Sequence, residues 1–263
     1  DCLLSRGLGD VYKRQVSLFW LPYPLADTSG SRLEGPSALH LLGTDRLGRD
    51  LLSQLMWGAR IALIVGACSV AIAAVLGTIV GLIAAFSRPW VDDTLSAGLD
   101  VVIAFPVLLL AMLVVAVQGA SLWSAVLAIG LAMSAVVARL TRILSRRVLQ
   151  EQFVTAARTS GTGVLGIVMQ HVLPNISAVL IVQITIRFAI AILAEAALSY
   201  LGLGTQPPQP SWGRMLSEAQ TLMFQQPLLA VFPGMAIALA VLGLNLLGDG
   251  LRDLLDPRLR KDL

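Results

Sequence analysis

The sequence has few charged residues and almost no histidine or cysteine. Charged side chains make up 13% of the 263 residues and hydrophobic ones 56%, whereas a soluble domain carries about 25% charged residues. The only histidines are His40 and His171, so we expect no metal site. The two cysteines, Cys2 and Cys68, imply no disulfide framework. The composition therefore indicates an integral membrane protein.

No group of residues has the pattern of a catalytic centre. A nucleotide-binding loop of the GxxxxGK[ST] type is missing, and Gly161-Thr162-Gly163 is too short for one and lacks the lysine. We therefore expect no enzyme activity, no cofactor and no ATP hydrolysis by this chain. The net charge of +3 is small and lies at the edges of apolar runs, so it does not indicate a nucleic-acid partner.

Long uncharged runs are what the sequence has instead. Residues 61–86 contain no charge over 26 positions, and residues 101–138 contain none over 38, which is too long for one span. About 20 helical residues cross a hydrocarbon core. The sequence predicts an all-α integral membrane protein, a bundle of about five transmembrane helices. The predicted spans are 61–86, 101–117, 122–138, 176–203 and 228–248. Residues 87–100 are expected to form a polar loop, and Pro106 to kink the second span.

A moderately polar segment, residues 151–175, separates the third and fourth predicted spans. Small residues at Ala156 and Ala157 allow another surface to approach the backbone closely. Gly161 permits a bend between two short helices, and Pro174 is expected to stop one helix before the next apolar run. The segment also carries an apolar stripe of Val164, Leu165, Ile167 and Val168. An amphipathic connector lying on the membrane surface is the alternative interpretation.

The spacing of this segment resembles the EAA loop of bacterial ABC importer permeases. That pattern is EAA, three residues, Gly, nine residues, Ile-x-Leu-Pro; here Thr155 replaces the Glu and His171 replaces the Ile. In that family the loop forms a short cytoplasmic coupling helix that fits a groove on the ATPase subunit. The resemblance implies ATPase-coupling residues at Thr155, Ala156, Ala157, Gly161, Leu173 and Pro174.

A second motif, LGTDRLGRD, precedes the first predicted span. It closely resembles a segment found on the outer face in the dipeptide, oligopeptide and nickel branch of these permeases, as do the strings AEAALSYLGLG and QPPQPSWG and the C-terminal end. Asp45 is expected to cap a helix, and Asp50 to begin an amphipathic interfacial helix. Docking of a binding protein and simple anchoring are both open for this motif. The motif residues are Gly43, Thr44, Asp45, Gly48, Arg49 and Asp50.

Two charged residues fall inside the fourth predicted span. Arg187 lies near mid-depth, where a charge costs at least about 2.5 kcal/mol, so it should face protein or water. Glu195 lies closer to the far interface. The two are eight residues apart, which is not an ideal spacing for contact on a helix. A structural polar contact and a place on a translocation path are both open for Arg187, the less expected of the two.

The charge distribution predicts an orientation. The loops on the side of residues 151–175 hold ten Lys and Arg residues and the opposite loops five, once residues 1–15 are set aside, so residues 151–175 should be cytoplasmic. Residues 1–15 look like translated adapter or vector sequence, the alternative being a short basic tail. The predicted layout is an external segment 16–60, a permease domain 61–248 and a cytoplasmic tail 249–263. The resembled family has six spans, so the first is expected to be missing here.

The resemblance implies a permease subunit of an ATP-driven importer in the bacterial inner membrane. Its implied partners are a second homologous permease, two ABC ATPase subunits and a soluble substrate-binding protein. The lipid bilayer surrounds the permeases. The implied substrate is a dipeptide, a longer peptide, a nickel chelate or a glutathione-like molecule. An ion-coupled secondary transporter, which usually carries ionisable residues at mid-membrane, and a non-transporting scaffold are the alternative functions.

Overall fold

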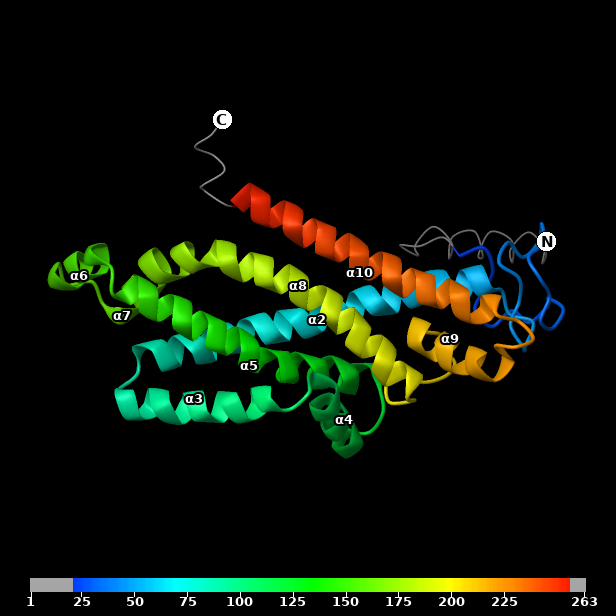
Figure 1. Cartoon of the computed structure of the whole chain (residues 1–263), viewed down its shortest axis with the longest axis horizontal. Coiled ribbons are helices and arrows are strands. Elements are labelled where there is room, and N and C mark those ends of the chain that lie inside the picture. The colour runs from blue at the N-terminus through cyan, green and yellow to red at the C-terminus, as the bar shows by residue number, and fades with distance from the viewer. Residues whose placement is uncertain (1–20, 256–263) are drawn as a thin grey trace, which may run out of the picture.

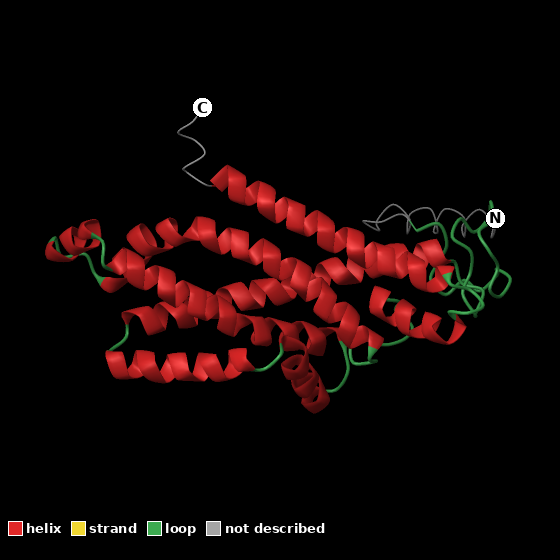
Figure 2. Cartoon of the chain, in the orientation of Figure 1, coloured by secondary structure: helices red, strands yellow, loops and turns green. Residues whose placement is uncertain are grey.

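The computed structural model describes residues 21–255, and the ordered elements of that part of the chain are helices (Figure 2). The α-helices are α2 (Leu51–Phe86), α3 (Pro89–Ala104), α4 (Val107–Gln118), α5 (Leu122–Leu149), α6 (Gln152–Thr159), α7 (Val164–Ile167), α8 (Leu173–Tyr200), α9 (Trp212–Ala219) and α10 (Leu228–Leu255). A π-helical turn (Val168–Val172) and a 3₁₀ turn (Gln220–Leu222) complete the set. The predicted all-α class is confirmed. The predictions for residues 1–15, and for the tail beyond residue 255, lie outside the described residues.

Helices α2, α5, α8 and α10 are each long and apolar enough to cross a membrane. A fifth span results if α3 and α4, which meet at an angle of 93°, count as one broken span. This agrees with the predicted bundle of about five.

The core forms where α2 packs along α5, with α8 and α4 alongside (Figure 1). Glycines let α2 and α5 approach closely: a Cβ on Gly77 would lie 2.6 Å from the Cβ of Val137, and one on Gly130 would lie 2.9 Å from Ile72. Close approach through small residues is how membrane helices gain packing energy, because lipid is as apolar as their own side chains. The buried core includes Val65, Ala73, Ile129, Met133, Ala191 and Leu198.

The bundle has two distinct ends (Figure 1). At the first, called the α6 end, α6 and α7 project beyond α5 and α8, and α10 runs toward this end but stops short of it. At the second, called the α9 end, α9 packs beside the start of α10, together with the irregular residues 21–50. The long helices thus carry a different small assembly at each end.

Several predicted boundaries are wrong. Residues 87–100 are not a polar loop, because α3 begins at Pro89 and runs to Ala104. The carboxylate of Asp92 is paired with two arginines of α5, so this acidic segment packs on the bundle as a helix. The predicted span 101–117 is likewise not one kinked helix, because Phe105 and Pro106 are extended and separate α3 from α4. A residue before proline disfavours the helical region.

Other helices extend past their predicted ends. The expected interfacial helix and the span 61–86 form one continuous α2, since no proline interrupts the chain between Leu51 and Ile61. Helix α5 runs eleven residues past the predicted end at 138, to Leu149, and α10 continues through 249–255 of the predicted tail.

Candidate functional site

Helix α6 ends in a motif that requires Gly161. The N–H of Gly161 donates to the carbonyl of Arg158, and that of Thr162 to Ala157, each at 3.0 Å. These two bonds satisfy the last carbonyls of the helix and place the residue after the cap in the left-handed region, where Gly161 has φ of +85°. The predicted bend is therefore present, and its cause is a helix C-cap.

The α6–α7 elbow, residues 151–172, is anchored through its apolar side chains. Val154 and Ile167 are buried and pack with Val172, Ile176 and Leu180. Around them lie side chains of α2 and α5, including Phe86 and Leu144. The elbow is thus a packed extension of the bundle and not a loose connector.

The outward side of the elbow combines small residues with exposed apolar ones. Thr155 and Ala156 are exposed and Ala157 is half-buried, as close approach by another surface requires. The predicted apolar stripe divides: Ile167 faces the core, whereas Leu165 is 75% exposed. Large apolar side chains are exposed on the elbow at Phe153, Val164, Leu165 and Met169.

Pro174 does not stop a helix, contrary to the prediction. The chain is helical from Val164 to Tyr200 and passes through the π-helical turn just before the proline. The N–H of Leu173 donates to the carbonyl of Val168, five residues back. A proline cannot donate to the carbonyl four residues before it, and the wider turn accommodates this. Leu173 is half-buried and packs on the elbow core, while Pro174 is exposed.

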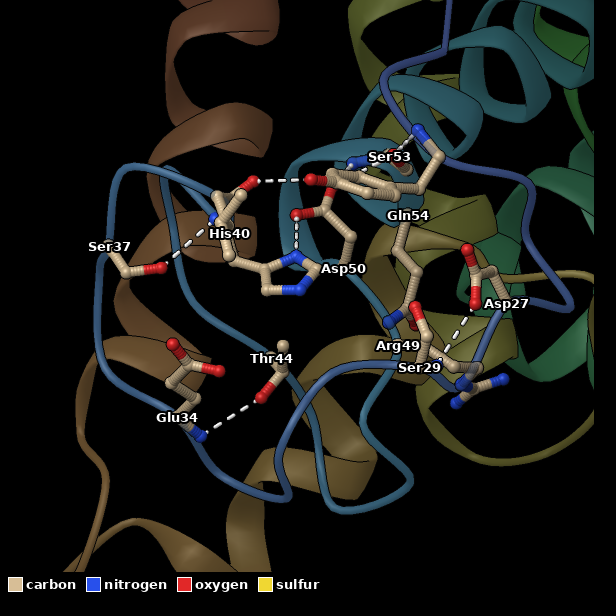
Figure 3. A network of polar contacts seen from close by, with 12 residues as sticks. Asp27, Ser29, Glu34, Ser37, His40, Thr44, Arg49, Asp50, Ser53 and Gln54 are labelled. Atoms are coloured by element: carbon tan, nitrogen blue, oxygen red, sulfur yellow. Dashed lines mark hydrogen bonds and ion pairs between the residues drawn. The ribbon is translucent and has the colours of Figure 1, made fainter.

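At the α9 end, Asp50 is the centre of a buried polar network (Figure 3). Its Oδ2 accepts the backbone N–H of Ser53 at 2.7 Å and the Ser53 hydroxyl at 2.8 Å, so Asp50 is the N-cap of α2. Its Oδ1 lies 3.0 Å from Nδ1 of His40. The ring of Tyr23 packs on that imidazole with centroids 4.7 Å apart. The network fixes where α2 begins relative to the preceding chain.

Asp45 shapes the LGTDRLGRD turn. The prediction that Asp45 caps a helix is wrong, because Asp50 is the N-cap of α2. Its Oδ1 accepts the N–H groups of Leu47 and Arg49, at 2.8 and 2.9 Å, and its Oδ2 accepts Nε of Arg49 at 2.7 Å. Asp50 is in the N-cap position because it lies directly before Leu51, the first helical residue. Gly48, with φ of +80°, closes the turn against the carbonyl of Gly30.

The six predicted motif residues come together in this assembly. Gly43 has φ of +84°, and its carbonyl accepts the N–H of Leu51 at 3.0 Å. The hydroxyl of Thr44 accepts the N–H of Glu34 at 2.9 Å and donates to the carbonyl of Ser31. The motif therefore folds residues 30–50 into one fixed shape.

Sequence reasoning missed the partners that this motif finds elsewhere in the chain. Arg49 lies 3.7 Å from Glu218 of α9, which also pairs with Arg214 at 2.9 Å. The i,i+4 spacing of Arg214 and Glu218 does predict an ion pair on a helix. His40 lies among turn-forming residues at no regular spacing from Asp50, so no sequence signal predicts their contact.

A hollow lined by both polar and apolar side chains opens between this turn and α9. It is lined by Arg46, Leu47, Arg49, Gln54, Pro207, Pro208, Gln209, Pro210, Arg214, Met215 and Glu218. Arg46 and Leu47 at its rim are exposed, and Leu39 and Leu41 nearby in sequence are 73% and 63% exposed. This end therefore offers a rigid surface with both cationic and apolar side chains.

The structure does not bring Arg187 and Glu195 together. Glu195 is 1% exposed, and its Oε1 accepts the hydroxyl of Ser199 at 2.6 Å. Arg187 is half-buried and forms no ion pair with any of residues 21–255. Within the same residues, no group of three or more His, Cys, Asp or Glu side chains could hold a metal ion.

Comparison with known proteins gives consistent matches. The family model described as "Binding-protein-dependent transport system inner membrane component" matches residues 77–261. The chain is 44% identical over 236 residues to the dipeptide transport system permease protein DppC of Alkalihalophilus pseudofirmus, covering 89% of this chain and 78% of that protein. It is 46% identical over 233 residues to the di/tripeptide permease protein DppC of Pseudomonas aeruginosa, covering 89% and 77%.

A third relative, and a solved structure, extend the comparison. The chain is 42% identical over 227 residues to the glutathione transport system permease protein GsiD of Pectobacterium atrosepticum, covering 86% of this chain and 75% of that protein. The fold is similar to a chain in an inward-facing structure of the MetNI methionine ABC transporter, with a TM-score of 0.65 at 17% identity. That match covers 77% of this chain and 96% of the other.

Proposed function

The chain belongs to the family of binding-protein-dependent transport system inner membrane components, and from this premise we propose that it carries small peptides as part of an ATP-driven importer. Family membership makes it a multi-pass permease of the cytoplasmic membrane. Peptides are the proposed substrate class because relatives at 44% and 46% identity are dipeptide and di/tripeptide permeases.

An ATPase and a substrate-binding protein are the partners that the family implies. We propose the fuller assembly of two ATPase subunits, this chain and a second homologous permease, with the binding protein docking outside. Hydrolysis belongs to the ATPase subunits. The permease contributes the surface that they push and the helices that move in response.

The structure of the α6–α7 elbow is the main support for this proposal. Its packed core, centred on Val154 and Ile167, transmits force from the elbow into α5 and α8. Its exposed Thr155 and Ala156 leave room for a groove to close over α6. Exposed apolar side chains beside them, such as Leu165, supply area that an ATPase surface would bury. Leu173 and Pro174 join the elbow to α8, so that movement of the elbow moves the long helix.

The α9 end is the proposed docking face for the binding protein. Gly43, Thr44, Gly48 and Asp50 hold the loop in shape. Asp45 and Arg49 connect it to α9. A surface that is fixed before binding loses little conformational entropy when a partner docks.

Co-purification with the ATPase subunits tests the proposal. Ala156→Trp places a bulky side chain on the exposed face of α6, where it should block the groove without disturbing the elbow core. Gly161→Trp should in addition strain the left-handed backbone at the cap. We expect both variants to insert into the membrane at wild-type level and to lose the ATPase subunits on purification.

The matched control is Gly163→Ala. An added Cβ at Gly163 meets nothing within 4 Å, and its φ is −70°, so alanine fits without strain. This variant should retain the ATPase subunits. Unchanged ATPase association in Ala156→Trp and Gly161→Trp would contradict the proposal, and a wild-type chain that transports without any ATPase would favour a secondary transporter instead.

A further inference from the structure

Arg187 is a charged residue deep within a membrane-spanning helix. It lies fourteen residues after the first residue of α8 and thirteen before the last. At 1.5 Å per residue, this places it about 20 Å from either end of the helix. A cation at that depth is costly unless it meets water, protein or an anion.

The chain supplies no anion for it. Within residues 21–255 the guanidinium of Arg187 forms neither an ion pair nor a hydrogen bond. The arginines that do form ion pairs lie toward the ends of the bundle: Arg49, Arg139, Arg142, Arg146 and Arg214. Glu195 cannot serve, because eight residues of helix rotate it by about 80° and it is held in the core by Ser199.

Gln183 lies one turn before Arg187 and shares its side of α8. It too is half-buried and makes no side-chain hydrogen bond within the described residues. Two exposed apolar side chains flank the pair, Ile186 and Ile190, each 38% exposed. Gln183 and Arg187 therefore form a short strip of unused hydrogen-bond donors on a side of α8 that its own bundle leaves partly open.

We propose that this strip lines the translocation path and that Arg187 binds the free carboxylate of the peptide being carried. The inference rests on the proposed function. A guanidinium presents two parallel N–H groups that match the two oxygens of a carboxylate. A peptide brings that carboxylate at its C-terminus, and the amide of Gln183 can pair with the adjacent peptide group. The rival occupant is an acidic residue of the second permease.

Uptake by the complete transporter tests the assignment. The assembly, with both permeases, the ATPases and the binding protein, is reconstituted in liposomes. ATP-dependent entry of radiolabelled dialanine is compared with that of dialanine amide, which lacks the carboxylate. We expect Arg187→Gln to reduce uptake of the free acid at least about tenfold at subsaturating peptide. Uptake of the amide should change little, so that the acid-to-amide ratio falls. The same binding protein is used throughout, so its own preference cancels.

Two further variants make the result specific. Arg187→Lys keeps the charge without the paired N–H groups and should retain an intermediate ratio. Arg60→Gln removes an arginine near the α9 end of α2, where its guanidinium lies over the Trp57 ring at 5.1 Å, and should behave as wild type. Subunit recovery and basal ATP hydrolysis should match wild type in each.

The contrary results are distinct. An unchanged acid-to-amide ratio in Arg187→Gln, with or without an equal loss of both substrates, would overturn the assignment. So would loss of the second permease from the purified Arg187→Gln complex, which would identify Arg187 as an interface contact. A wild-type transporter that carries neither peptide would instead refute the proposed function, and the assignment with it.

Discussion

Asp50 joins the start of α2 to the preceding loop through one carboxylate. It caps α2 through Ser53, it lies within hydrogen-bond distance of His40, and it is 4% exposed. Asp50→Ala would remove the cap and leave the imidazole without its buried partner. We expect a loss of about 1–2 kcal/mol in the free energy of unfolding from the cap alone, with a further loss from the unpaired ring. The fall in thermal unfolding midpoint of the purified protein in detergent measures it.

Arg46→Ala is the control for that measurement. Arg46 belongs to the same motif but is exposed. Its replacement should therefore change the free energy of unfolding by no more than about 0.5 kcal/mol, and the midpoint should stay close to that of wild type. If Asp50→Ala and Arg46→Ala unfolded at the same temperature, the buried network would contribute nothing to stability.

Single residues show where sequence reasoning is reliable and where it is not. The positions of the motif glycines and Gly161 could be predicted, because positive φ leaves few other residues possible. The choice between Asp45 and Asp50 as the cap could not be predicted, because both are aspartates close to the start of the helix and their contacts depend on how the turn folds. The contact of Asp50 with His40 was out of reach for the same reason. Site assignments for ATPase coupling and docking stay predictions.

Among the elements, α3 depends on a buried ion-pair cluster. Asp92 is 1% exposed and bonds Arg142, with Oδ2 2.6 Å from a terminal guanidinium nitrogen, and also pairs with Arg146. Both arginines come from one face of α5. The cluster attaches the start of α3 to the end of α5, beside the elbow. Because α4 turns away at Phe105, this attachment helps to align α3 with the bundle.

Asp92→Ala should therefore destabilise the protein strongly. Removing one partner of a buried pair costs about 3–5 kcal/mol, and the partial exposure of both arginines reduces this to roughly 2–3 kcal/mol. The same detergent unfolding measurement applies. Asp100→Ala is the matched control, because Asp100 pairs with Arg139 on the same two helices but both side chains are more than half exposed. It should cost at most about 1 kcal/mol; an equal cost for both variants would show that burial is not what matters.

The element scale also explains which helices could be predicted. Helices α2, α5, α8 and α10 follow from long uncharged runs, since only a helix satisfies its own backbone in lipid. Helix α3 was missed because Asp92, Asp93 and Asp100 made its sequence look like a loop. The arginines that pair with Asp92 and Asp100 lie about forty to fifty residues later in the chain. The continuous path through Pro174 was missed because a π-helical turn has no sequence signal.

For the molecule as a whole, the two ends have opposite assignments. Coupling to an ATPase requires the α6 end to be cytoplasmic, and docking of a binding protein requires the α9 end to be external. Helix directions make these assignments inseparable: α5 ends at the elbow and α8 begins there, so the elbow and α9 lie at opposite ends of α8 (Figure 1). One measured side therefore fixes the other.

Single-cysteine labelling of a chain whose two cysteines are replaced by serine tests this orientation. Gln152→Cys on α6 and Gln209→Cys before α9 both replace exposed polar residues. The excess of Lys and Arg on the elbow side, ten against five in the sequence, favours retention of that side in the cytoplasm. A membrane-impermeant maleimide should therefore label Gln209→Cys in intact spheroplasts and Gln152→Cys only after lysis. Labelling of Gln152→Cys in intact cells would place the elbow outside, where no ATPase could reach it, and coupling through α6 would then be impossible whatever the loop resembles.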